Sequence, residues 1–375
     1  MDTAMTAGTS LVCPSCGGGV AEGDRFCEAC GSALTSSPDE PTVEVATNTA
    51  ANSAATVEVP VNAAVQPCRS CGGVVGDDGY CQTCGTKAAK PRDHFDEQPA
   101  AWVAMTCDRG IRHHRNEDAA ALDADAEPGS RAVLVVCDGV SSSTDSDVAS
   151  LAAAKAARDV LAVGRAQGLG TESSRISAIV ARFKAAADAA QEAVLTNTSP
   201  GSSNPASCTF VAAVVENGLI VAGNVGDSRA YWFPDAGEAV GLTVDDSWAA
   251  ELMATGVSRH EAETGPHAHA ITRWLGTDAP DHTPKTTHLR AESAGWLLVC
   301  SDGLWNYCSE AVPLGELVRR TAAEHGGEPR AMSSALVDWA NAQGGQDNIT
   351  VALARIPGAA APVTTQTTEP TVGRN

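Results

Sequence analysis

The sequence contains few aromatic and few basic residues and has no long hydrophobic run. Aromatic residues make up 4% of the 375 positions, and 25 lysines and arginines face 46 aspartates and glutamates, giving a net charge of −21. Such a chain lacks the positive charge that draws proteins to nucleic acid or to anionic membranes. No apolar run approaches the roughly 20 residues of a membrane span, and the amino-terminal MDTAMTAGTS has no signal-peptide pattern. We therefore expect a cytoplasmic protein that binds neither nucleic acid nor membranes.

Two short cysteine-rich segments stand out near the amino terminus. Eight of the 13 cysteines form two matched sets, which are Cys13, Cys16, Cys27 and Cys30, and then Cys68, Cys71, Cys81 and Cys84. A glycine follows every Cys-x-x-Cys pair, as it does in zinc knuckles, and two such turns close a tetrahedral Cys₄ site. Disulfide or redox pairs are the alternative, but no strand and helix pattern of a redox protein surrounds them. We predict two zinc ribbons with one structural Zn²⁺ each, which supplies their folding free energy.

Composition and periodicity divide the chain into six parts. We expect zinc ribbon 1 at 11–34, a flexible linker at 35–66, zinc ribbon 2 at 67–86, a linker at 87–99, a main domain at 100–357 and a disordered tail at 358–375. Neither ribbon carries the basic stripe that nucleic-acid binding requires, so a nucleic-acid-binding role is disfavoured and we expect the ribbons to bind a protein partner.

The main domain alternates between strand and helix patterns. Apolar runs predict strands at 131–137, 208–215, 218–224, 229–233, 296–301 and 348–355. Asn217-Gly218 between two of them predicts a tight hairpin turn. Apolar residues on one face predict helices at 146–163, 174–196, 312–322 and 331–342. This pattern predicts an α+β fold in which helices cover antiparallel sheets.

Two of the predicted strands end in the same way. VLVVC runs into Asp138-Gly139, and WLLVCS runs into Asp302-Gly303. Asp-Gly after a strand is often only turn chemistry, but here three further acidic motifs accompany the pair, namely RNED at 115–118, GDSR at 226–229 and GQDN at 345–348. If the motifs converge, several carboxylates at close range require cations, and hard oxygen ligands favour Mg²⁺ or Mn²⁺ over Zn²⁺.

In this order, the acidic motifs resemble those of the metal-dependent type 2C serine/threonine protein phosphatases. The resemblance covers 104–356 and includes DRG at 108–110, SCT at 207–209 and SDGL at 301–304. It implies a four-layer α-β-β-α sandwich with a two-metal centre between the sheets. It also implies hydrolysis of phosphoserine and phosphothreonine in proteins by a hydroxide that two metal ions activate, without a covalent intermediate.

The resemblance also implies roles for single residues. Asp138 is expected to bridge two Mn²⁺ or Mg²⁺ ions, with the Gly139 carbonyl and Glu117 at one ion. Asp302 and Asp347 are expected at the other ion, and Asp227 is expected to share a third, weaker ion with Asp302. Asp118 is expected behind the ligands, where it orients water molecules.

The chain departs from the family pattern at two places. His113 stands where the family usually carries a phosphate-binding arginine, and histidine offers neither a permanent charge nor a bidentate fork. We expect Arg112, His113 and Arg115 to share phosphate binding. Val140 stands where eukaryotic relatives carry a histidine proposed to protonate the leaving group, and we assign no residue to that task. These departures motivate the alternative of a weak or inactive phosphatase-like module that binds phosphoproteins, although the intact aspartates argue against it.

Overall fold

The structure is a computed structural model that describes residues 11–12, 19–20, 67–68, 71–86, 88–164, 170–265 and 267–358. The chain consists of two compact units, Met1–Gln66 and Pro67–Asn375. In the first unit, β1 (Leu11–Val12) pairs antiparallel with β2 (Gly19–Val20). The cysteines of the first expected ribbon, the expected linker at 35–66 and all of the expected tail but its first residue lie outside the described residues. No helix within the described ranges is long and apolar enough to cross a membrane.

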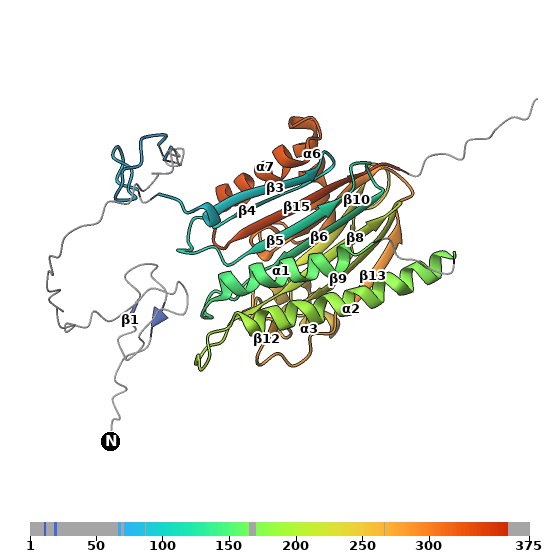
Figure 1. Ribbon diagram of the computed structural model, residues 1–375, viewed down its shortest axis with the longest axis horizontal. Helices are drawn as coiled ribbons and strands as arrows, with labels where there is room; N and C mark the ends of the chain where they lie inside the picture. The colour runs from blue at the N-terminus through green and yellow to red at the C-terminus, as the bar shows by residue number, and fades with distance from the viewer. Residues whose placement is uncertain are drawn as a thin grey trace, which may run out of the picture. The chain divides into compact units, whose positions relative to one another are not determined.

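The larger unit contains a six-stranded antiparallel sheet (Figure 1). Its strands, in spatial order, are β11 (Val240–Gly241), β10 (Arg229–Pro234), β14 (Gly295–Cys300), β15 (Ile349–Ile356), β4 (Val103–Asp108) and β3 (His94–Ala100). The inner strands β10 and β14 are buried at every position. Apart from Arg229 at the start of β10, both strands consist of apolar and aromatic residues, because both faces of the sheet are covered.

A five-stranded antiparallel sheet packs against the first. Its order is β13 (Lys285–Arg290), β9 (Leu219–Val225), β8 (Phe210–Glu216), β6 (Arg131–Cys137) and β5 (Ala119–Ala124). Asn217 and Gly218 join β8 to β9 with φ of 51° and 75°, which confirms the predicted two-residue turn. Leu134 and Val211 from this sheet share a buried core with Leu297 from the other, so the two sheets meet face to face.

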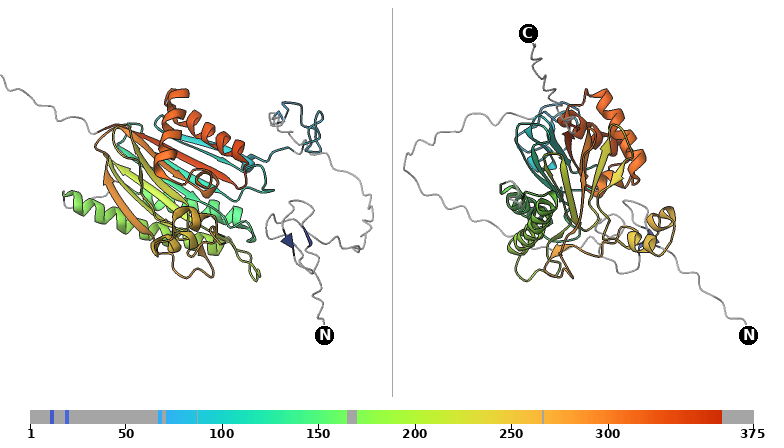
Figure 2. Two further views of the ribbon diagram at one scale, coloured as in Figure 1. Left: turned by 180° about the vertical axis from the view of Figure 1, so that it is seen from behind. Right: turned by 90° about the vertical axis from the view of Figure 1, so that its right-hand side faces the viewer.

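Helices cover the outer face of each sheet (Figure 2). The helices α1 (Ser146–Ala162) and α2 (Glu172–Thr196) bury one face against the five-stranded sheet, with Phe183 fully buried in that core. The helices α6 (Ala311–Glu324) and α7 (Pro329–Gln343) do the same on the six-stranded sheet, where Leu336 is fully buried. The four predicted helices therefore exist, each within three residues of its predicted bounds.

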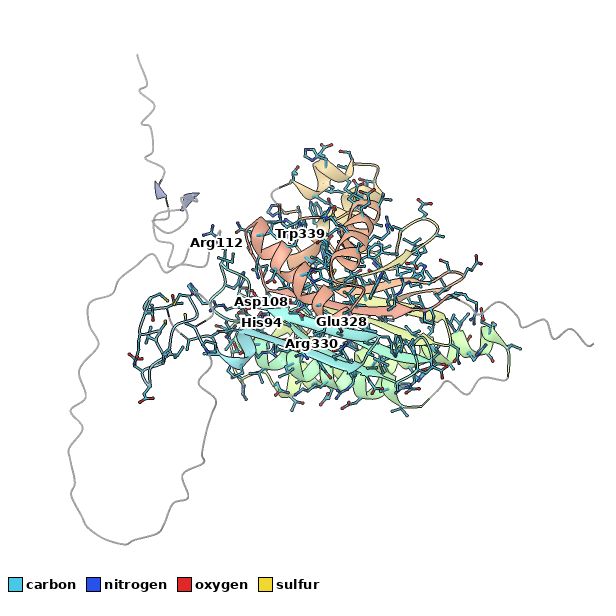
Figure 3. The ribbon with its side chains drawn as sticks, turned by 90° about the horizontal axis from the view of Figure 1, so that it is seen from above. His94, Asp108, Arg112, Glu328, Arg330 and Trp339 are labelled. Atoms are coloured by element: carbon cyan, nitrogen blue, oxygen red, sulfur yellow. The ribbon has the colours of Figure 1, made fainter. Side chains whose placement is uncertain are left out.

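Most of the expected linker at 87–99 belongs to the main domain. A 3₁₀ turn at Pro91–Asp93 is followed by β3, which begins at His94 and pairs with β4. The sequence HFDEQPA is polar because β3 is an edge strand that is only partly buried. His94 and Asp108 lie side by side on the two strands (Figure 3), with Nδ1 of His94 2.6 Å from Oδ2 of Asp108.

Short elements extend the main fold near one end of the sheets. β7 (Ser207–Cys208) pairs with β12 (Leu275–Gly276), and α5 (Asp302–Trp305) follows β14. Between β11 and β12 the chain forms α3 (Trp248–Ala254) and α4 (Arg259–Glu263), which share a small core of their own around Ala262. We refer to residues 245–274 as the flap segment.

Candidate active site

The two strand-Asp-Gly motifs come from different sheets. Asp138 follows β6 and Asp302 follows β14, so each aspartate lies where its strand leaves the sheet. Two hydrogen bonds join Asp138 to Thr209, since Asp138 N donates to the Thr209 hydroxyl Oγ1 at 3.0 Å and Thr209 N donates to Asp138 O at 2.8 Å. Both glycines permit close backbone approach. A Cβ at Gly139 would lie 2.7 Å from Glu117 O, and one at Gly303 would lie 1.9 Å from Asn348 O.

The structure brings five predicted aspartates into mutual electrostatic range. Burial first, and then the neighbouring carboxylates, raise the pKa values of Asp138 and Asp302 well above their ordinary range. Burial is also the main cause that raises the pKa values of Asp118 and Asp227 to about 7. The fifth, Asp347, contributes to the repulsion at all four of the others. Without counter-ions, such a cluster cannot stay fully ionised at neutral pH.

Asn348 ties the glutamate of the RNED motif to the last strand of the fold. Its Oδ1 accepts from Glu117 N at 2.7 Å, while its Nδ2 donates to Arg109 O at 2.8 Å and to Arg115 O at 3.1 Å. This carboxamide therefore fixes the loop before β5 against the start of β15. The Glu117 side chain is buried, and its Oε1 accepts from Arg115 Nε at 2.9 Å.

Asp118 is fully buried behind the other carboxylates. Its Oδ2 accepts from Ser301 Oγ at 2.6 Å and from Thr350 Oγ1 at 2.7 Å. Ser301 is the residue before Asp302, so the hydrogen bond links Asp118 to the end of β14. Both hydroxyls therefore bind the same oxygen atom of Asp118, Oδ2.

Three carboxylate oxygens of the cluster are buried without a hydrogen-bond partner. They are Glu117 Oε2, Asp118 Oδ1 and Asp302 Oδ1. Buried carboxylate oxygens are costly when they are unpaired, and hard divalent cations satisfy such oxygens. The donor set and the unpaired oxygens therefore fit Mg²⁺ or Mn²⁺.

The three residues expected to bind phosphate have different surroundings. His113 Nε2 lies 3.2 Å from Asp347 Oδ1, and its Nδ1 lies 3.3 Å from Ser141 Oγ. Arg115 is engaged by carboxylates, because its Nη1 lies 3.5 Å from Asp147 Oδ1 in addition to the Glu117 contact. Arg112 is exposed, and its guanidinium has no partner within the described part of the chain. Of the three, only Arg112 offers a guanidinium free to grip a phosphate.

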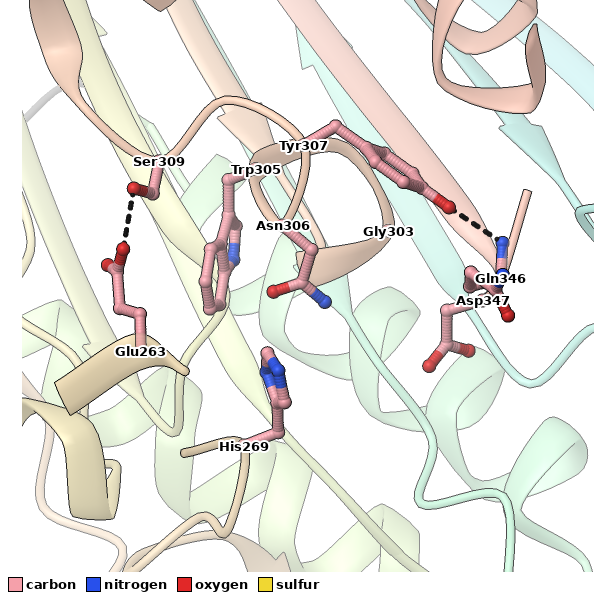
Figure 4. Close-up of a pocket in the computed structure, with 9 residues that line it drawn as sticks. All are labelled: Glu263, His269, Gly303, Trp305, Asn306, Tyr307, Ser309, Gln346 and Asp347. Carbon is pink, nitrogen blue, oxygen red and sulfur yellow. Dashed lines mark hydrogen bonds between the residues drawn. The ribbon is translucent and has the colours of Figure 1, made fainter. Parts of the chain in front are cut away.

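A cavity of about 240 Å³ opens beside Asp347 and Gly303 (Figure 4). The flap segment contributes Glu263 and His269, and the stretch after β14 contributes Trp305, Asn306 and Tyr307, with Ser309 and Gln346 completing the wall. Two hydrogen bonds brace the wall, because Ser309 Oγ donates to Glu263 Oε2 at 2.9 Å and Gln346 N donates to Tyr307 Oη at 2.9 Å. Sequence reasoning missed this cavity, since no motif joins the flap segment to α5.

The second cysteine set forms a compact group of thiols. Within the described ranges, Cys68, Cys71, Cys81 and Cys84 are the one set of at least three His, Cys, Asp or Glu side chains whose ligand atoms all lie within 4.8 Å of one another. The sulfur atoms of Cys68 and Cys84 are 3.6 Å apart and those of Cys71 and Cys81 are 3.5 Å apart. A disulfide needs about 2.05 Å, so these thiols are free. Hydrogen bonding between Cys84 and Thr86 is the main cause that lowers the pKa of Cys84 to about 6.

Comparisons with known proteins agree with this geometry. A family model described as "Protein phosphatase 2C" matches residues 110–341. A relative named "Serine/threonine phosphatase stp" from Listeria innocua is 31% identical over 255 residues, which span 66% of this chain and 92% of the relative. The structure is similar to the S. agalactiae serine/threonine phosphatase, with a TM-score of 0.56, 23% identity, and coverage of 70% of this chain and 100% of that one.

A further solved structure is the catalytic domain of the phosphatase PstP in complex with two manganese ions. It has a TM-score of 0.51 and 24% identity to this chain, covering 68% of this chain and 97% of that one. The protein is therefore a serine/threonine phosphatase. More narrowly, it belongs to the protein phosphatase 2C family, which confirms the resemblance inferred from the acidic motifs.

Proposed function

We propose that this protein hydrolyses phosphoserine and phosphothreonine in other proteins at a centre of two divalent cations, Mn²⁺ or Mg²⁺. The observation that carries the proposal is the group of unpaired, buried carboxylate oxygens at Glu117, Asp118 and Asp302. These residues come from both sheets, and bound divalent cations would satisfy the unpaired oxygens and keep the carboxylates ionised at neutral pH. The solved structure of PstP with two manganese ions supports the same metal type.

Each carboxylate has a proposed place in the centre. Asp138 would bridge both cations, with the Gly139 carbonyl and Glu117 on one side and Asp302 and Asp347 on the other. Asp227 would hold a third, weaker cation together with Asp302, and Asp118 would orient water molecules from behind. When bound, the cations supply positive charge that lowers the pKa of a water molecule and offsets the negative charge of the phosphate.

The chain's own residues hold and orient the substrate. Arg112 offers an exposed guanidinium, and His113 and Arg115 lie close to the carboxylates of Asp347 and Glu117. Cys107 and Cys300 of the main domain are poorly suited to act as nucleophiles, because burial raises the pKa values of their thiols far above neutrality. The two sheets with helices on their outer faces are inferred to be the four-layer α-β-β-α sandwich of the family, which begins at β3 rather than at residue 100.

We further infer that the cysteine set at 68–84 holds a structural Zn²⁺. Sulfur separations of 3.5 and 3.6 Å are close to those of a tetrahedral site with Zn–S distances of about 2.3 Å. The matched set at 13–30 is inferred to hold a second Zn²⁺. The small size of both modules favours binding of a protein partner over a chemical role.

The test is hydrolysis of a phosphothreonine peptide with Mn²⁺ by the full chain. We expect Mn²⁺-dependent turnover that Asp138→Ala abolishes, with weakened Mn²⁺ binding in calorimetry. Asp159→Asn, on an exposed side chain of α1, is the matched control and should behave like the wild type. A wild-type protein that binds Mn²⁺ stoichiometrically but does not turn over would instead support the inactive phosphoprotein-binding module.

A further inference from the structure

Trp305 presents an unsatisfied hydrogen-bond donor in the wall of the cavity beside Asp347. The side chain is only 4% exposed, and its indole Nε1 has no hydrogen-bond partner. Figure 4 shows the nitrogen on the side of the ring that faces Asn306. A buried N–H without an acceptor is costly, and such groups in native proteins call for an explanation.

The orientation of this indole is fixed by its surroundings. The guanidinium carbon of Arg229 lies 3.5 Å from the centroid of the Trp305 ring. Arg229 is itself locked, since its Nε donates to Asp245 Oδ1 at 2.9 Å and its Nη1 donates to Ser309 O at 3.1 Å. The stacked ring cannot turn to bring Nε1 to another acceptor without breaking these contacts. The donor is therefore preorganised for something that enters the cavity.

The charges around the cavity select the kind of acceptor. Glu263 and Asp347 line the same space, so a carboxylate entering it would meet two like charges. Tyr307 Oη accepts from Gln346 N, which leaves its own hydroxyl hydrogen available as a second donor. A neutral oxygen acceptor fits this wall, and the amide carbonyl is the one that every protein substrate carries.

We propose that this cavity is a substrate subsite in which Trp305 Nε1 donates to an amide carbonyl of the phosphoprotein near its phosphorylated residue. The proposal rests on the proposed phosphatase function and adds to it the residue that distinguishes a protein substrate from a small phosphate ester. The carbonyl belongs either to the substrate's main chain or to an Asn or Gln side chain.

The experiment compares Trp305→Phe with Trp102→Phe in the full chain with Mn²⁺. Trp102 is equally buried, but its Nε1 already donates to Asp125 O at 2.8 Å, so W102F removes a satisfied N–H elsewhere. For each protein, kcat/KM is measured on a phosphothreonine peptide and on p-nitrophenyl phosphate. The ratio of the two values should fall about five- to tenfold in W305F, as expected for one lost hydrogen bond. W102F should keep the wild-type ratio.

Substrate variants identify the carbonyl. Each main-chain carbonyl of the peptide is replaced in turn by a thioamide, which is a weaker acceptor, and each Asn or Gln is replaced by Leu. One replacement should lower kcat/KM in the wild type and have no further effect in W305F. An unchanged activity ratio in W305F, or replacements that affect both proteins equally, would overturn the subsite while leaving the phosphatase function intact. Absence of any turnover in the wild type would overturn both.

Discussion

His113 lies between two carboxylates of the candidate metal centre. Its Nε2 is 3.2 Å from Asp347 Oδ1, and its Nδ1 is 3.9 Å from Glu117 Oε2. The family's usual arginine is replaced at this position by a shorter side chain that contacts the candidate ligands themselves. We therefore expect phosphate capture to depend on Arg112 more than the family pattern implies.

Restoring the arginine should strengthen substrate binding. We expect His113→Arg to lower KM for a phosphothreonine peptide by about tenfold, because a guanidinium carries a permanent charge and a bidentate fork. His114→Arg is the matched control, since it adds the same charge at the adjacent, exposed position. Steady-state kinetics with Mn²⁺ check the prediction. Equal effects of the two variants would show that only net charge matters.

The metal-free protein should be less stable at alkaline than at mildly acidic pH. Asp118 and Asp227 have pKa values of about 7 in the fold, against about 3.9 when unfolded. Between these values the native state binds more protons, so the unfolding free energy falls as pH rises from about 4 to about 7. Thermal unfolding in chelator should therefore give a lower Tm at pH 8 than at pH 5.5.

Two comparisons make the pH prediction specific to the cluster. Asp118→Asn removes one of the titrating carboxyls, so its Tm should change less between the two pH values. Added Mn²⁺ binds the ionised carboxylates and should raise Tm more at pH 8 than at pH 5.5. A wild-type Tm that rises with pH in chelator would contradict the prediction.

The buried ion pair between Arg229 and Asp245, the first residue of the flap segment, should contribute far more to stability than an exposed ion pair. Arg229→Ala leaves Asp245 buried without its partner, and we expect a loss of about 3–5 kcal/mol in unfolding free energy. Arg290 pairs with Glu172 on the surface, so Arg290→Ala should cost at most about 1 kcal/mol. Urea denaturation of both variants measures the difference. Comparable losses would mean that Asp245 finds another partner.

The ribbons should hold two zinc ions that are independent of the phosphatase centre. We expect mass spectrometry of the full chain under native conditions to show two Zn²⁺ per chain. Replacing Cys71 and Cys84 by serine should remove one Zn²⁺ and leave the rate on p-nitrophenyl phosphate close to the wild-type rate. Retention of both ions in this variant would contradict a Cys₄ site at 68–84.

The strands that could be predicted from the sequence are those that are buried on both faces of a sheet. β6 and β14 were predicted to within a residue because strands buried on both faces are continuous apolar runs. The edge strands β3 and β13 were missed, since HFDEQPA and KTTHLR are largely polar where one face meets solvent. β4 and β5 were also missed, and the alanine-rich AAALDA of β5 has no strand period.

Only some features of the candidate site could likewise be predicted from the sequence. The carboxylates could be found from the sequence because each lies in a short motif at the end of a strand. Trp305 could not be singled out, because its importance lies in an unmade hydrogen bond beside Arg229, which only the packed structure reveals. The engagement of Arg115 by Glu117 and Asp147 likewise depends on side chains that are distant from one another before folding.

The position of β15 has a consequence for synthesis of the protein. This strand follows every other strand of both sheets in the chain, yet it lies between β14 and β4 in the middle of the six-stranded sheet. Asp347 and Asn348 immediately precede it. A chain that is synthesised only as far as Gln346 therefore lacks the strand that joins β14 to β4 and one of the predicted carboxylates, Asp347. Activity toward phosphoproteins should begin only after residues 349–356 have left the ribosomal tunnel, so a partly translated chain cannot act on the cell's phosphoproteins.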